Sequence, residues 1–117
     1  MKKDETSRQG QSLDRLLSPH LFKAMCDPNR IAIVCYLSER CAALTVSQIA
    51  ENLPVDVSVV SRHLSILRDA GILAANKRGK EVHYSLNTRN LIQVLRSIAD
   101  AFEKCCPDQC LTKEPQQ

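Results

Sequence analysis

The chain has 117 residues, of which 44% are hydrophobic and 25% are charged, as in a single small folded domain. Aromatic residues make up only 3% and tryptophan is absent, which predicts an aliphatic core and argues against stacking of single-stranded nucleic acid on aromatic side chains. The net charge of +3 is mildly basic, so a duplex-DNA partner would require the Lys and Arg residues to gather on one face.

Six cysteines are a high count for a chain of this length. The first ten residues, MKKDETSRQG, lack the apolar stretch of a signal peptide, and no segment reaches the roughly 18 apolar residues that a membrane helix needs. We therefore expect a cytoplasmic protein with no membrane partner. In that compartment clustered cysteines more often bind metals or take part in redox chemistry than form structural disulfides.

The first predicted elements are helices. Residues 1–12 are polar and are expected to form a flexible arm, and a short helix over 13–25 is predicted to break or restart at Pro19. Asp27 followed by Pro28 is a strong helix start, because Asp caps free amides and Pro suits the first helical position. The helix that follows is expected to end near residue 40 and to offer four residues for burial: Ile31, Ile33, Val34 and Leu37.

Two closely spaced helices are expected next. Thr45 and Gln48 fit a capping box for a short helix that ends near Asn52. Asp56 or Ser58 then caps a second helix, which is expected to end at Gly71 in a left-handed conformation. One face of this second helix carries the apolar residues Val60, Leu64 and Leu67.

The pattern then changes to strands. Residues 72–75 and 81–86 are predicted to form a hairpin whose connection, 76–80, contains Gly79 and three cations. A last helix begins after Thr88 and is stopped by Pro107. Its apolar stripe is expected to form a dimer interface together with two residues of the first helix, and the full set is Leu13, Leu16, Leu91, Leu95, Ile98 and Phe102.

Two helices joined by a tight turn and followed by a basic hairpin predict a mainly helical winged helix-turn-helix fold. The second helix should enter the major groove of DNA, and the hairpin should reach the backbone or the minor groove. The expected DNA-binding residues are Ser58, Ser61, Arg62, His63, Ser65, Lys77, Arg78 and Lys80, with Arg68 at the margin of the helix face. Alternatively the helix face is only solvated, and for His63 a local hydrogen bond is as good an interpretation as DNA contact.

Three segments resemble the ArsR/SmtB family of metalloregulatory repressors: AMCDPNRI over 24–31, VVSRHLSILRDAGIL over 59–73 and KRGKEVHY over 77–84. The resemblance spans roughly residues 15–104. It implies a homodimer that binds an inverted-repeat operator in double-stranded DNA and blocks transcription of resistance genes until an inducer binds. Residues 13–104 would then form the DNA-binding and dimerisation domain, and residues 105–117 a cysteine-containing tail.

Cys105, Cys106 and Cys110 place three thiols within six residues, where the last helix stops. Thiolates select soft ions, and trivalent arsenic prefers three sulfur ligands. Lys104 should help the thiols to ionise. The resemblance supports this site, since some family members carry a Cys-Cys pair and a further Cys at the end of the last helix and respond to arsenite or antimonite. We therefore expect a repressor that leaves DNA when the metalloid binds, with no organic cofactor.

Other uses of the thiols stay open. One alternative is that the tail cysteines have no function, and a second is that they form a redox-sensing disulfide. A third is that they bind zinc or cadmium with a fourth ligand such as Asp108, His83 or a residue of the other subunit. The family's Cys-x-Cys site is absent because SERCAAL over 38–44 has one Cys, and its zinc site is doubtful because the last helix has Asp100 and Glu103 but no His.

An enzyme or a carrier is the competing class of function, either a thiol oxidoreductase or a metal-binding carrier. A redox enzyme would usually show Cys-x-x-Cys beside a βαβ pattern, and the chain shows neither, so we expect no enzyme. Cys26 and Cys35 fall within helical patterns and are expected to be small buried residues, whereas Cys41 is either filler or an accessory ligand.

Overall fold

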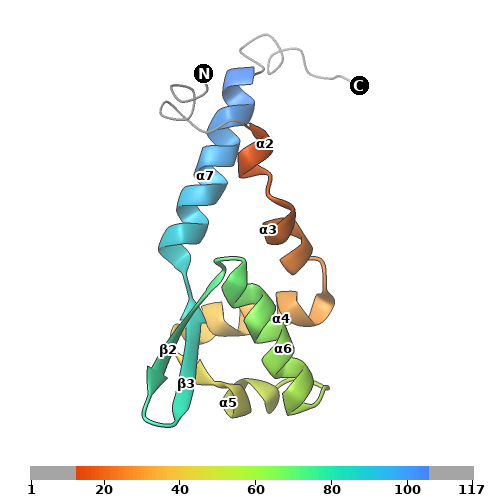
Figure 1. Ribbon diagram of the computed structural model, residues 1–117, viewed down its shortest axis with the longest axis vertical. Helices are drawn as coiled ribbons and strands as arrows, with labels where there is room; N and C mark the ends of the chain where they lie inside the picture. Colours follow the sequence, from red (N-terminus) through yellow and green to blue (C-terminus); the bar gives the residue numbers. More distant parts are fainter. Residues whose placement is uncertain (1–12, 106–117) are drawn as a thin grey trace. The chain divides into compact units, whose positions relative to one another are not determined.

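The computed structural model describes the backbone of residues 13–105, and the predicted arm over 1–12 and the tail from 106 onward lie outside the described residues. The described chain divides into two compact units. One unit holds α2 (Leu13–Leu16) and residues 92–105 of α7 (Thr88–Cys105), and the other holds residues 19–91 with all remaining elements (Figure 1). The predicted division into arm, domain and tail stays a prediction.

The unit of residues 19–91 begins with α3 (Pro19–Ala24) and α4 (Pro28–Arg40). Pro19 is the first residue of α3, so the predicted restart of the helix is confirmed. The side chain of Asp27 accepts a hydrogen bond of 2.8 Å from the Asn29 amide, and Pro28 occupies the first turn of α4. The predicted helix start is therefore confirmed in both its parts.

The helix pair consists of α5 (Val46–Ala50) and α6 (Val57–Asp69). The Gln48 amide donates to Thr45 Oγ1 over 3.2 Å, and the Thr45 amide donates to Gln48 Oε1 over 2.9 Å, which confirms the capping box. Asp56 is the cap residue of α6, although its side chain makes no capping hydrogen bond. Gly71 follows α6 with a φ of 82°, the left-handed conformation predicted for it.

The sheet has three antiparallel strands in the order β1–β3–β2, formed by Leu44–Thr45, Glu81–Leu86 and Leu73–Arg78. The prediction that β2 ends at Ala75 is wrong, because Asn76, Lys77 and Arg78 continue to pair with β3. Only Gly79 and Lys80 remain to make the turn, and the φ of 65° at Gly79 suits such a tight connection. β1 was not predicted.

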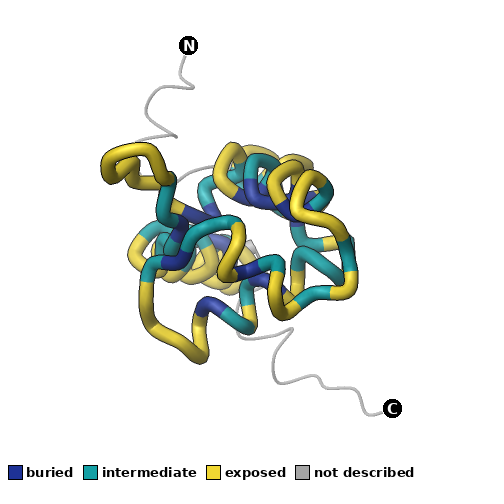
Figure 2. The backbone as a smooth tube through the Cα atoms, turned by 90° about the horizontal axis from the view of Figure 1, so that it is seen from below, coloured by how far each residue is buried: buried dark blue, intermediate teal, exposed yellow. Residues whose placement is uncertain are grey.

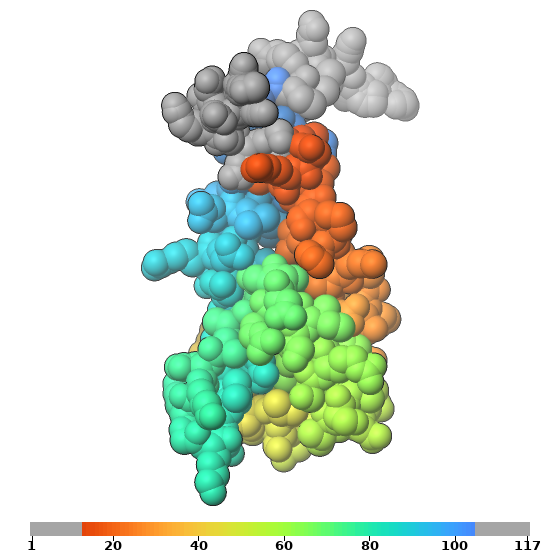
Figure 3. All heavy atoms as spheres, viewed as in Figure 1, coloured from red at the N-terminus to blue at the C-terminus, as the bar shows by residue number. Residues whose placement is uncertain are grey.

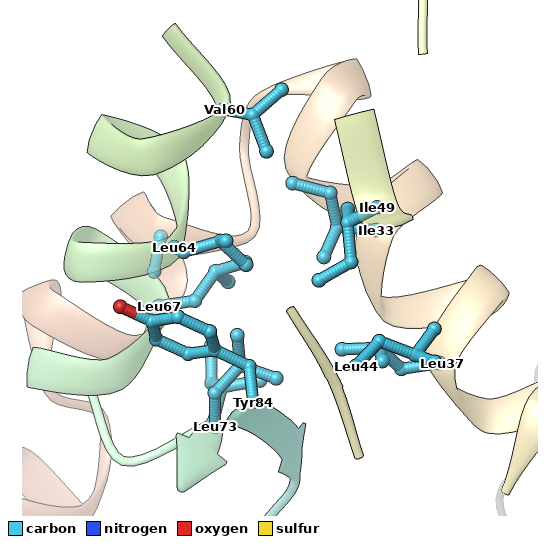
Figure 4. Close-up of a cluster of buried hydrophobic side chains, with 11 residues drawn as sticks. Ile33, Leu37, Leu44, Ile49, Val60, Leu64, Leu67, Leu73 and Tyr84 are labelled. Atoms are coloured by element: carbon cyan, nitrogen blue, oxygen red, sulfur yellow. The ribbon is translucent and has the colours of Figure 1, made fainter. Parts of the chain in front are cut away.

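The core lies where α4, α5 and α6 meet the sheet. Val60, Leu64 and Leu67 of α6 point toward aliphatic side chains of α4 and α5, with Leu73 and Tyr84 of the strands beside them (Figure 4). Ile33 and Leu37 are buried as expected and Val34 is half-buried. The expected burial of Ile31 is wrong, since its side chain is 45% exposed; residues two positions apart on a helix, such as Ile31 and Ile33, do not share a face.

The unit of residues 19–91 is therefore a winged helix-turn-helix, mainly helical with a hairpin wing, as predicted. Figure 2 separates its buried positions, in dark blue, from the exposed positions in yellow. Within residues 13–105, no helix combines the length and the apolar character needed to cross a membrane.

Candidate nucleic-acid interface

α6 is amphipathic in the manner that groove reading requires. Its inward residues are fully buried, whereas Ser58, Ser61 and Arg62 are exposed and Ser65 is half-buried. Arg68, at the margin, is exposed and forms an ion pair of 3.1 Å with Asp69. Hydroxyl and guanidinium groups on such a face can bond phosphates or base edges, and a DNA contact by Ser58, Ser61, Arg62 and Ser65 stays a prediction.

His63 lies elsewhere. Its side chain belongs to the buried face of α6 and is only 8% exposed, and its Nδ1 lies 3.2 Å from Nη1 of Arg30 on α4. A side chain held in this way is poorly placed to reach a base edge. Of the two interpretations that the sequence left open, the geometry supports the local hydrogen bond and corrects the assignment of His63 to the DNA contacts.

The wing presents its cations on more than one side. Lys77 and Arg78 are adjacent on β2 and both exposed, and alternation along a strand directs them to opposite faces of the hairpin, while Lys80 stands in the turn. In Figure 3 the hairpin, in teal, projects beyond the atoms of α5 and α6 in the same unit. Glu81 pairs in register with Arg78 and offsets part of the positive charge.

The base of the wing is fixed to α6. The Ile72 amide donates to the Leu67 carbonyl over 3.0 Å, and both side chains are fully buried. β2 begins at the next residue and packs against α6. α6 and the basic hairpin therefore share one rigid support.

The start of α7 is tied to the end of α6. Asn90 Nδ2 donates to the Gly71 carbonyl over 2.9 Å, and the Asn87 amide donates to the Ile72 carbonyl over the same distance. Asn90 was not among the predicted residues. An Asn inside the first turn of a helix gives no sequence signal of a bond to a residue 19 positions away.

The apolar residues of α7 lie on one stripe that is buried along one edge and exposed along the other. Leu91 is half-buried and Ile98 is 9% exposed, whereas Leu95 and Phe102 are 54% and 48% exposed. The exposed face runs through Ile92, Leu95, Ala99 and Phe102. Of the predicted stripe, Leu95 and Phe102 are therefore open to a partner, whereas Ile98 offers little surface. Leu13 and Leu16 of α2 are half-buried.

The cysteines with described side chains, Cys26, Cys35 and Cys41, are all free and exposed. The expected burial of Cys26 and Cys35 is wrong. Cys26 lies in the turn after α3, and Cys35 stands two positions from both Ile33 and Leu37 and so on the opposite side of α4. Cys35 and Cys41 each line an open pocket, of about 330 Å³ and about 400 Å³.

The predicted metalloid site falls at the edge of the described chain. Cys105 is the last residue of α7, while its side chain and the whole of Cys106, Asp108 and Cys110 lie outside the described residues. In the part of the chain whose side chains are described, no group of three or more His, Cys, Asp and Glu residues is placed to hold a metal ion. His83, a candidate fourth ligand for zinc, has a buried Nδ1 without a hydrogen-bond partner and an Nε2 3.6 Å from Glu81.

Comparison with known proteins identifies the family of this chain. Residues 27–75 match the model of the arsR family of bacterial regulatory proteins. The transcriptional repressor SdpR of Bacillus subtilis is 35% identical over 59% of this chain and 74% of its own length. The chain belongs to the arsR family. The family consists of regulatory proteins, so the expectations of a DNA-binding regulator and of no enzyme are confirmed at the level of the family.

Two further similarities describe this ArsR-family protein. It is 42% identical to the arsenical resistance operon repressor of Escherichia coli over 62% of its own chain, and it spans only 61% of that repressor's length. An ArsR-like transcriptional regulator from Rhodococcus has a similar structure, with a TM-score of 0.67 and 26% identity over 80% of this chain and 84% of the other.

Proposed function

We propose that this ArsR-family protein is a cytoplasmic transcriptional repressor that binds operator DNA as a homodimer. We further propose that trivalent arsenic or antimony is the inducer, and that Cys105, Cys106 and Cys110 bind it and thereby release the DNA. The observation that carries the proposal is the pairing of an exposed polar face on α6 with the cationic wing on one rigid support.

The DNA contacts divide between the two elements. Ser58, Ser61, Arg62 and Ser65 on α6 would read the major groove and its nearest phosphates. Lys77, Arg78 and Lys80 would neutralise phosphates beside it, which contributes affinity but little sequence preference. His63 is not among the proposed DNA contacts, because its side chain is buried.

The exposed face of α7 supports a homodimer. Ile92, Leu95, Ala99 and Phe102 follow one another at intervals of three, four and three residues, the spacing at which two helices pack along a shared line. Apolar side chains left half-exposed in this way favour a partner helix. A second copy is the natural partner, because one recognition helix reads only a few base pairs and a symmetric pair reads two half-sites.

The inducer is inferred from the donor set. Sulfur is the donor that trivalent arsenic and antimony prefer, and the three tail cysteines begin at the residue where α7 ends. The relative from Escherichia coli is named as an arsenical resistance repressor. α7 continues from the Asn90–Gly71 hydrogen bond to Cys105, so it connects the proposed inducer site to the end of α6 through one continuous element.

Thiol-based redox sensing is the second candidate. The free, exposed thiols of Cys26, Cys35 and Cys41 favour it, because accessible thiols are open to oxidation. In that case an oxidant, rather than arsenite, would release the protein from DNA.

Two measurements test the proposal. First, the full chain selects duplexes from a random-sequence DNA library, and we expect enrichment of an inverted repeat, called the selected duplex below. Second, arsenite is titrated into the reduced protein while thiolate–arsenic absorbance is followed. We expect saturation in the wild type and in Cys26→Ser/Cys35→Ser/Cys41→Ser, and loss of the signal in Cys105→Ser/Cys106→Ser. Failure to enrich any duplex would overturn the proposed DNA binding. An absorbance signal that survives in Cys105→Ser/Cys106→Ser would overturn the proposed arsenic site.

A further inference from the structure

Arg30 joins three helices of the unit formed by residues 19–91. From the first turn of α4, its Nε donates to the Ala24 carbonyl over 2.8 Å and its Nη2 donates to the Lys23 carbonyl over 3.4 Å, both at the end of α3. Its Nη1 lies 3.2 Å from Nδ1 of His63 on α6. One guanidinium on α4 therefore connects α6 to the end of α3.

The chemistry of the pair fixes the state of the imidazole. A guanidinium is always charged and has donors but no acceptor, so Nδ1 of His63 must accept from Arg30. The proton of the neutral ring then lies on Nε2. Protonation of the ring would put a hydrogen on Nδ1 as well, which removes the acceptor and sets two positive charges about 3 Å apart.

Asp27 provides the opposing interaction. Its carboxylate caps α4, and its pKa is lowered chiefly by the hydrogen bond from the Asn29 amide, against an opposing effect of desolvation and with a smaller contribution from the charge of Arg30. His63 lies close enough to this carboxylate to interact with it electrostatically when protonated. A protonated His63 would thus be repelled by Arg30 and attracted by Asp27. Because His63 is only 8% exposed, its ring cannot turn to solvent without moving α6.

We propose that Arg30 and His63 form a positioning pair that holds the recognition helix for DNA binding, and that protonation of His63 breaks the pair and weakens binding. This inference rests on the proposed DNA-binding function. Imidazole is the side chain type whose charge changes most readily near neutral pH, so a pH series is a suitable probe of the pair. The expected sign is diagnostic, because acidification otherwise makes a protein more positive and strengthens its attraction to phosphate.

Binding of the selected duplex by the full chain, measured at about pH 8 and about pH 5.5, tests the proposal. His63→Asn keeps an oxygen acceptor near the position of Nδ1 but cannot be protonated. We expect the wild type to bind at least about fivefold more weakly at the lower pH and His63→Asn to lose this dependence. His20→Asn, at an exposed position on α3, is the matched control and should behave like the wild type.

A second readout does not depend on DNA or on a folded variant. Nitrogen NMR of the wild-type imidazole at about pH 8 should show an unprotonated Nδ1 and a protonated Nε2 for His63. The opposite tautomer would overturn the pair, as would equal pH dependence in the wild type and His63→Asn while both bind the selected duplex. Failure to select any duplex would instead remove the proposed function and with it this effect on DNA.

Discussion

The side-chain amide of Asn90, in the first turn of α7, donates a 2.9 Å hydrogen bond to the carbonyl of Gly71, the residue that ends the recognition helix in a left-handed conformation. A Cβ added at Gly71 would lie 2.8 Å from Nδ2 of Asn90, so the absence of a side chain is what permits this contact. This hydrogen bond therefore fixes the start of α7 to the end of α6.

Gly71→Ala should destabilise the protein by about 2–3 kcal/mol. A left-handed φ of 82° costs an L residue roughly 1–2 kcal/mol, and displacement of Asn90 loses a hydrogen bond of about 1 kcal/mol. Gly79→Ala is the matched control, because its φ is 65° and nothing lies within 4 Å of the added Cβ, so only the conformational cost remains. Urea denaturation of both variants measures the difference. Equal losses would show that the Asn90 contact contributes nothing.

Removing any one cation of the wing should weaken DNA binding for all sequences alike. Lys77→Ala, Arg78→Ala and Lys80→Ala each delete one candidate phosphate contact, which should lower the slope of log affinity against log salt by about 1. Lys23→Ala, which removes an exposed cation of α3, is the control. Anisotropy titrations of the selected duplex at several salt concentrations test this. An unchanged slope in all three wing variants would exclude the wing from the interface.

Leu95→Glu should convert the dimer to a monomer. Leu95 is 54% exposed on the apolar face of α7, where a charge would have to be buried against the partner helix. Gln93→Glu places the same charge at an exposed position of the same helix outside the apolar face and should leave the dimer intact. Sedimentation equilibrium distinguishes the two. A wild type that sediments as a monomer would contradict the proposed homodimer.

We expect protonation of the Asp27 carboxylate to make the protein less stable in acid. Its pKa is lowered in the folded chain, first by the Asn29 amide, so the folded state holds this proton less readily than the unfolded state. The stabilisation is present above the unfolded pKa and is lost as the pH falls through the lowered folded pKa. Asp27→Asn retains an acceptor but no charge, and should flatten the acid limb of unfolding midpoints measured in urea from neutral pH downward.

Asp56→Asn is the control for that experiment, since Asp56 caps α6 without a side-chain hydrogen bond. Its stability should follow the wild-type pH dependence. If Asp27→Asn also does so, the cap of α4 has no part in acid sensitivity.

Much of the fold is local and was therefore predictable. The caps at Asp27 and Thr45 and the turn at Gly71 are set by residues within four positions of one another, and all three are confirmed. β1 could not be predicted because a strand of two residues has no periodic pattern. Leu44–Thr45 is a strand only because it pairs with Tyr84 and His83, which lie far along the chain.

Burial was harder to predict because it depends on neighbours far along the chain. The periodicity of α7 shows which positions are apolar, but not that Ile98 is buried while Leu95 is exposed. For His63 the sequence left a DNA contact and a local hydrogen bond equally open, because the partner of that bond, Arg30, is 33 residues away. Cys35 was expected in the core because cysteine is often a small buried residue, although it lies on the side of α4 away from Ile33.

Release of DNA by arsenite tests the proposed coupling between the tail cysteines and DNA binding. The wild type and Cys105→Ser/Cys106→Ser are each bound to the fluorescent selected duplex at neutral pH, and anisotropy is followed as arsenite is added under reducing conditions. Cys26→Ser/Cys35→Ser/Cys41→Ser is the control for thiols outside the tail. The proposed mechanism predicts that arsenite weakens DNA binding by roughly 5–150-fold in the wild type and the control, and leaves it unchanged in the tail variant. Release of the tail variant, or a wild type that stays bound, would contradict it.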